Sequence, residues 1–225
     1  MPQTTSTTKP FFALLLALCL GFSGAALEGI QAHVMKMGGL VEAAIGEAAN
    51  AMVARDQELA EQVRAADKAI DALEELINER CANLIALRAP AAVDLRVVLS
   101  VMKIAGNLER IGDYAKNMAK RTSVLVHMEQ VEGAHASLKR MAHEVQMMLK
   151  DVLDAFIQRD VNLTRDVLER DEGVDQMYNA LFREFLTFMM EDPRSISQIH
   201  SVLWVLRALE RIGDENMNQP LDAPS

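Results

Sequence analysis

The feature that most constrains this fold is a six-residue segment that occurs twice. Leu-Glu-Arg-Ile-Gly-Asp stands at residues 108–113 and again at residues 209–214, each time in a stretch with helical periodicity. The flanks repeat as well, since the Arg-Asp pair at residues 55–56 matches the one at residues 159–160. The chain is therefore predicted to be a tandem duplication of a unit of about a hundred residues, a common size for a small domain.

Each unit is predicted to contain three long helices. Apolar residues recur at helical spacing, and the chain has no period-2 run and no Asn-Gly or Asp-Gly hairpin signal. Asp56 is the expected N-cap of the second helix, and Pro90 suits the first turn of the third. Helices of this length favour up-and-down bundles with short connections, so the fold is predicted to be all-α. The expected helices span residues 27–54, 56–87, 90–121, 130–158, 160–190 and 193 onward.

Each copy of the repeated segment places two carboxylates four residues apart. Glu109 and Asp113 form the first pair, and Glu210 and Asp214 form the second. On a helix such residues share one face, about 6 Å apart along the axis, where like charges destabilise the helix by roughly 0.2–0.5 kcal/mol. A bound cation would offset that repulsion, and carboxylate oxygens suit Mg²⁺, Mn²⁺ or Fe. The four carboxylates are therefore candidate ligands of a divalent or trivalent metal.

A pair of carboxylates cannot complete a coordination shell, so each site would need further ligands. Asp67, Asp71, the asparagine one turn beyond each pair, a second protomer or water could supply them. For Asp67 and Asp71 we expect instead an acidic face in the N-terminal half of the helix, favoured by the helix dipole. The alternative for the first pair itself is an ion pair of Arg110 with Asp113, three residues away, that leaves Glu109 solvated.

The composition argues against several classes of function. With 23 basic and 32 acidic residues the net charge is −9, so no nucleic-acid partner is expected. A ferritin-type di-metal oxidase needs two Glu-x-x-His motifs, and only Glu132 with His135 fits. The sequence shows no nucleophile–His–acid arrangement and no Gly-rich phosphate loop. We therefore predict no catalytic residues and no enzyme activity.

The N-terminal segment differs in character from the rest of the chain. Residues 11–20 are uncharged and almost wholly apolar, they follow Lys9, and residues 23–25 are small. This is the form of a secretory signal peptide, and the stretch is short for a membrane span. The alternative is an apolar start to the first helix that the bundle buries. Taken alone, the segment from Phe11 to Ala25 favours export.

The repeated segments and their surroundings resemble the PhoU family. Residues 37–40 (Met-Gly-Gly-Leu), 67–71 (Asp-Lys-Ala-Ile-Asp) and 88–96 are similar to further motifs of that family, and the resemblance covers roughly residues 27–218. Members fold as two three-helix bundles related by a pseudo-twofold. The resemblance therefore implies an all-α chain of six long helices in two tandem three-helix bundles.

The resemblance also implies a function. PhoU proteins are cytoplasmic, often homodimeric and not known as enzymes, and they repress the phosphate-starvation response when phosphate is plentiful. They are thought to couple the high-affinity phosphate ABC transporter, through its ATPase subunit, to a sensor histidine kinase, so their association with membrane complexes is peripheral. Some members bind iron, manganese or magnesium through Glu/Asp-x-x-x-Asp motifs, which correspond here to Glu109 with Asp113 and to Glu210 with Asp214.

We therefore expect a cytoplasmic negative regulator of phosphate uptake and of the phosphate-starvation response. The alternative is an exported or metal-storing helical-bundle protein without a phosphate-signalling role. Exported and cytoplasmic proteins would separate on cell fractionation, because only the exported form would be shortened and periplasmic.

Both ends of the sequence depart from the family pattern. The family's first helix usually begins with a polar stretch, and its second motif continues for several turns where Pro220 ends the helix here. We expect residues 1–26 to be a divergent apolar segment, 27–124 the first three-helix bundle, and 125–225 the second, shortened at its C-terminal end. A shifted reading frame or misplaced start would account for both departures, and resequencing the gene would test this.

Overall fold

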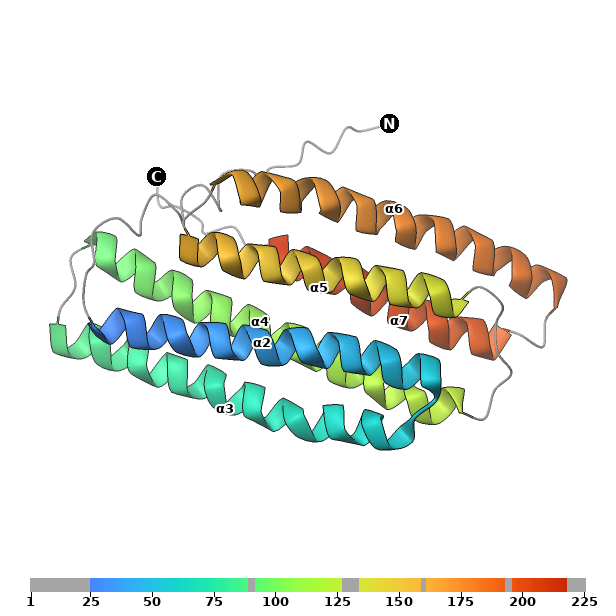
Figure 1. Ribbon diagram of the computed structural model, residues 1–225, viewed down its shortest axis with the longest axis horizontal. Helices are drawn as coiled ribbons and strands as arrows, with labels where there is room; N and C mark the ends of the chain where they lie inside the picture. Colours follow the sequence, from blue (N-terminus) through green and yellow to red (C-terminus); the bar gives the residue numbers. More distant parts are fainter. Residues whose placement is uncertain (1–24, 89–91, 127–133, 159–160, 193–195, 218–225) are drawn as a thin grey trace.

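The computed structural model describes residues 25–88, 92–126, 134–158, 161–192 and 196–217, and it is all-α over those ranges, without a strand (Figure 1). The all-α prediction is confirmed. The helices are α2 (Ala25–Ala54), α3 (Gln57–Arg88), α4 (Ala92–Leu125), α5 (Ala134–Gln158), α6 (Val161–Glu191) and α7 (Ile196–Met217). Their ends lie within a few residues of the predicted ones, although Pro90 and Pro193 lie outside the described residues.

The connection between α2 and α3 shows how the local sequence sets these boundaries. The Asp56 carboxylate accepts a hydrogen bond from the Leu59 amide at 3.0 Å, so the predicted N-cap of α3 is confirmed. The amide of Asp56 donates to the carbonyl of Ala51 at 2.9 Å, and the Arg55 amide donates to that of Met52 at 3.3 Å. This pair of bonds closes the C-terminus of α2, and it requires a left-handed residue, which here is Arg55 with φ 57°.

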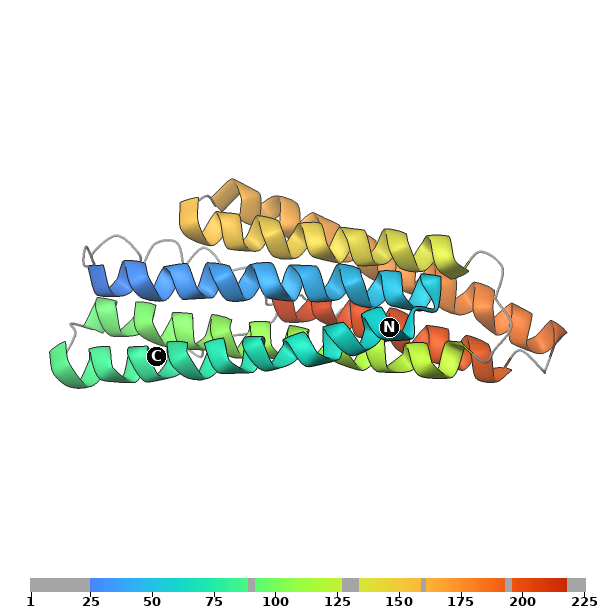
Figure 2. The same cartoon turned by 60° about the horizontal axis from the view of Figure 1, so that its bottom comes forward.

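The helices form two three-helix bundles that lie side by side, with their helices along the long direction of the molecule (Figures 1 and 2). Helices α2, α3 and α4 pack on one another, as do α5, α6 and α7. The bundles meet through α2 on α5 and α4 on α7, while α3 and α6 lie on the two outer sides. Each of these contacts joins a helix to its counterpart in the other unit, and the partners run antiparallel (Figure 1). A twofold axis between the bundles, as the resemblance implies, would give this arrangement.

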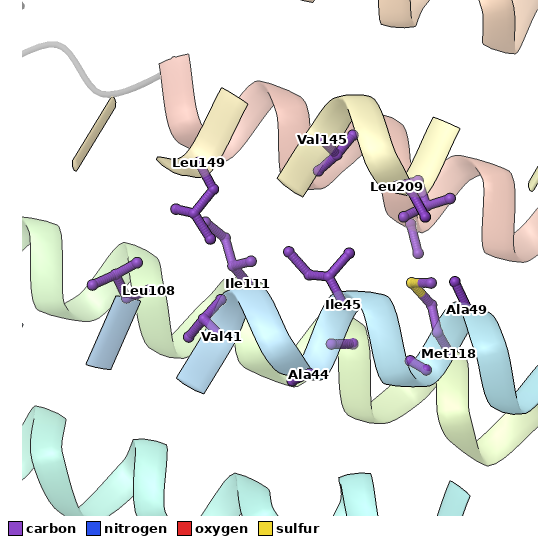
Figure 3. Packing of buried hydrophobic residues seen from close by; sticks show 14 of the residues in the cluster. Val41, Ala44, Ile45, Ala49, Leu108, Ile111, Met118, Val145, Leu149 and Leu209 are labelled. Carbon is purple, nitrogen blue, oxygen red and sulfur yellow. The ribbon is translucent and has the colours of Figure 1, made fainter. Parts of the chain in front are cut away.

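The hydrophobic core continues from one bundle into the other. Figure 3 shows Ile45 of α2, Ile111 of α4 and Val145 of α5 converging between the bundles, and all three are fully buried. Gly38 and Gly46 of α2 face α5, where a Cβ would meet Leu153 and Gln146 respectively. A Cβ on Gly38 would overlap the Leu153 side chain, at 2.2 Å from its Cδ1. The bundle interface is therefore a closely packed part of the core.

The signal-like segment from Phe11 lies outside the described residues, apart from Ala25, which begins α2. Residues 218–225, with Pro220, lie outside them too. Among the helices that the structure does describe, none combines the length and the apolar character needed to cross a bilayer.

Candidate functional site

The first predicted carboxylate pair lies on the side of α4 that faces α3. Glu109 and Asp113 are both partly exposed, at the edge of the first bundle. The pKa of Glu109 lies above its ordinary value of 4.5, first because of burial and then because of the nearby negative charges of Asp113, Asp71, Glu74 and Asp67. The two predicted residues are thus close enough to repel one another, and carboxylates from α3 join them.

Asp67 of α3 is the most deeply buried member of this group. Its side chain is only 4% exposed, its Oδ2 is bound by Lys116, and its Oδ1 has no hydrogen-bond partner. Asp67 is buried because α3 turns this residue toward α4. Gly112 lies where α3 and α4 approach, since a Cβ there would make a tight contact of 3.1 Å with Cδ1 of Ile70 and an ordinary contact of 3.7 Å with the Asp67 Oδ1. The glycine of the repeated motif therefore lies at the close approach of α3 and α4, next to Ile70.

Lys116 brings a positive charge into this group of carboxylates. Its Nζ lies 2.5 Å from Oδ2 of Asp67 and 3.2 Å from Oδ1 of Asp113, and these contacts raise the pKa of the ammonium. Lys116 follows Asp113 by three residues, the spacing that also made Arg110 a candidate partner. Sequence reasoning missed Lys116, although its position on the Asp113 face was a usable signal.

Asp71 completes the group on the solvent side. Asp71 is exposed as a residue, but partial burial of its carboxyl group raises its pKa, and the negative charge of Asp67 raises it further. The positive charge of Lys116 acts in the opposite direction and lowers the pKa of Asp71. We call Asp67, Asp71, Glu109, Asp113 and Lys116 the α3–α4 cluster. It contains four carboxylates from two helices and one ammonium group.

The donor chemistry of the α3–α4 cluster fits a hard cation. All four carboxylates offer oxygen ligands, and the unpartnered Oδ1 of Asp67 is a buried acceptor that a cation would satisfy. Nevertheless, within the described residues no three His, Cys, Asp or Glu side chains converge closely enough to hold one ion. The Lys116 ammonium is bound to Asp67 and Asp113, where a shared metal would have to lie. Metal binding here would therefore require the side chains to rearrange.

The second predicted pair is only partly described. Glu210 of α7 is 8% exposed, and its Oε1 accepts a hydrogen bond from the Arg207 guanidinium at 2.5 Å. Arg207 also lies over the ring of Tyr178, with 5.5 Å between its Cζ and the ring centroid. The side chain of Asp214 lies outside the described residues, so the pairing of Glu210 with Asp214 stays a prediction. Arg207 has no equivalent in the first unit, where Gly106 occupies its place.

Comparison with known proteins gives a consistent result. The PhoU domain family matches residues 34–122 and again residues 138–218, one match in each bundle. The chain is 42% identical to the phosphate-specific transport system accessory protein PhoU homolog of Pseudomonas putida, over 86% of this chain and 76% of that one. It is 39% identical to the Escherichia coli K12 phosphate-specific transport system accessory protein PhoU, over 88% and 82%.

Two crystal structures are similar along most of their length. PhoU from Pseudomonas aeruginosa has a TM-score of 0.82 and 41% identity, over 86% of this chain and 92% of that one. The phosphate transport system regulatory protein PhoU from Streptococcus pneumoniae has a TM-score of 0.78 and 31% identity, over 85% and 89%. The family resemblance predicted from the repeated segments is thereby confirmed.

Proposed function

The chain belongs to the PhoU family, so it has an accessory, regulatory role in phosphate transport, and we propose that it acts as a negative regulator of the phosphate-starvation response. In this proposal it works in the cytoplasm as a homodimer. It couples the ATPase subunit of a phosphate ABC transporter to a sensor histidine kinase when phosphate is plentiful. The family match across both bundles is the observation that carries the proposal.

The architecture suits a protein that acts by binding. Within the described ranges, six long helices form two bundles with extended outer surfaces on α3 and α6, and the core runs continuously between the bundles. A partner that contacts one bundle can therefore affect the other through packed side chains. We propose a stoichiometric adaptor, whose effect depends on which partner occupies its surface.

The α3–α4 cluster is the proposed metal centre of this adaptor. Asp67, Asp71, Glu109 and Asp113 would hold Mg²⁺, Mn²⁺ or Fe, and Glu210 with Asp214 would form the second site. A bound metal would supply positive charge that neutralises these carboxylates. The residues themselves link α3 to α4 across the outer edge of the first bundle. Metal occupancy would thus stabilise the conformation that the partners bind.

The experiment that tests the regulatory proposal uses the full chain in a bacterium that lacks its own PhoU. A reporter for a phosphate-starvation promoter should be repressed in phosphate-rich medium when the chain is expressed, and it should stay active with an empty vector. Pull-down of the tagged chain should recover the transporter ATPase and the kinase, and light scattering should give the mass of a dimer. Failure to repress, together with failure to bind either partner, would refute the proposal.

A further inference from the structure

We infer that Lys116 is a built-in counterion of the α3–α4 cluster and that it sets the affinity of this site for divalent metal by competing for the same oxygens. The inference rests on the proposed metal centre and concerns one residue that the repeated motif does not contain. Lys116 Nζ lies within 3.2 Å of carboxylate oxygens from both α3 and α4. A divalent metal shared by Asp67 and Asp113 would need those oxygens at about 2.0–2.6 Å. The ammonium and the metal therefore exclude one another.

Asp67 shows that the site has capacity for a further cation. Its carboxylate is 96% buried, and Lys116 satisfies Oδ2 but leaves Oδ1 without a hydrogen-bond partner. A buried carboxylate oxygen without a partner is costly, so the cluster with Lys116 alone is incompletely satisfied. A metal ion, which can bind several oxygens at once, would satisfy Asp67 more fully than one ammonium group.

The Lys116 ammonium can also move away from the carboxylates. Its side chain is 39% exposed and hangs on a flexible four-carbon stem, so the ammonium can move into water when a metal arrives. The residue at the equivalent place in the second unit is Met217. There the carboxylate of Glu210 is paired with Arg207, on the preceding helical turn. A cationic side chain therefore lies beside the motif in both units, but it comes from Lys116, after the motif, in the first unit and from Arg207, before the motif, in the second. The exchangeable ammonium is that of Lys116 in the first unit.

The test is a manganese titration of three variants of the full chain. Lys116→Met removes the ammonium and introduces the residue of the second unit, whereas Lys116→Arg keeps the charge. Lys120→Met is the matched control, because Lys120 is exposed, lies one turn further along α4 and carries the same charge. Isothermal titration with MnCl₂ would give the dissociation constant, and thermal unfolding with and without MnCl₂ would give a readout that does not depend on regulation.

Lys116→Met should bind Mn²⁺ at least tenfold more tightly than the wild type, a difference of about 1.4 kcal/mol. Its metal-free form should have a lower Tm, because Asp67 loses its only described ion pair, and Mn²⁺ should raise that Tm more than it raises the wild-type Tm. Lys116→Arg and Lys120→Met should stay within about twofold of the wild-type affinity. If the Met variant does not fold, Lys116→Gln removes the same charge with a polar side chain and should show the same tightening.

Equal tightening in Lys116→Met and Lys120→Met would overturn the inference, because only the general charge would then matter. An affinity of Lys116→Met for Mn²⁺ that is unchanged or weaker than that of the wild type would overturn it too. Equal affinity of the wild type, Lys116→Arg and Lys116→Met would have the same meaning. These readouts are separate from the reporter and pull-down. If the wild-type chain represses the reporter but substitution of Lys116 does not change the metal affinity, only the inference about Lys116 is refuted. If the wild-type chain neither represses the reporter nor binds the partners, the proposed regulatory function is refuted.

Discussion

The close contact between the bundles can be tested with two neighbouring glycines of α2. A Cβ at Gly38 would lie 2.2 Å from Cδ1 of Leu153 on α5, whereas a Cβ at Gly39 would meet nothing within 4 Å. Gly38→Ala therefore inserts a methyl group into the bundle interface, and Gly39→Ala adds the same group on the exposed side of the same helix. The pair differs only in what the new methyl group meets.

The magnitude follows from two opposing effects. Replacing a mid-helix glycine with alanine stabilises a helix by about 1 kcal/mol, and both variants share this gain. Only Gly38→Ala must also displace Leu153, which is buried and has little room to move, and such overpacking costs about 1–3 kcal/mol. We expect Gly38→Ala to be less stable than Gly39→Ala by about 2 kcal/mol, or roughly 4–8 °C in Tm for a chain of this size.

Urea unfolding followed by circular dichroism, with a thermal scan of the same samples, would measure the difference. Gly39→Ala should unfold at a higher urea concentration than the wild type. If Gly38→Ala is stabilised as much as Gly39→Ala, then α5 does not pack against Gly38 and the described contact between the bundles is wrong. In a double-mutant cycle that includes Leu153→Ala alone, Gly38→Ala should cost less in the Leu153→Ala background than in the wild type if the two side chains do collide.

Three further predictions concern single residues. Arg55→Gly should raise the free energy of unfolding by roughly 0.5–1 kcal/mol in urea titrations, because Arg55 has a φ of 57° and glycine adopts this conformation without strain; a destabilised variant would contradict the described turn. The pKa of Glu109 is higher in the folded state than its ordinary value of 4.5, so the folded protein binds the Glu109 proton more tightly than the unfolded chain does. The contribution of Glu109 to stability is therefore fully present below pH 4.5, and it is lost as the pH rises through the folded-state pKa. Glu109→Gln should therefore be more stable than the wild type at pH 7 in low-metal buffer, with a gap that narrows toward pH 4, and a gap constant with pH would refute the shift. Phe185→Ala should cost about 3–5 kcal/mol and Phe182→Ala less than about 1 kcal/mol, since the two side chains are 1% and 37% exposed, and equal costs on denaturation would show that α6 faces another way.

The helices could be predicted from the sequence because their signals are local. Apolar spacing, the Asp56 cap and the tandem repeat each depend on a few neighbouring residues, and the structure follows them closely. The turn at Arg55 was harder to predict. Its left-handed conformation usually calls for glycine, so the residue itself gave no sign of the hydrogen bonds that close α2.

The candidate site could be predicted only in part, because most of it forms between helices. The spacing of Glu109 and Asp113 correctly places them on one side of α4. The burial of Asp67 depends on how α3 is rotated toward α4, which helical periodicity does not specify. Lys116 reaches the cluster with a long, flexible side chain, so its contact with Asp67 depends on tertiary structure.

The central claim is that the carboxylates of the α3–α4 cluster hold a metal that the regulator needs. Its most direct test combines elemental analysis with the promoter reporter for the double variant Glu109→Ala with Asp113→Ala. The matched control is Glu75→Ala with Glu79→Ala, which removes two exposed carboxylates at the same spacing from α3. The double variant at the cluster should bind less metal and repress less in phosphate-rich medium, while the control behaves as the wild type. Full repression after loss of the metal would contradict the claim.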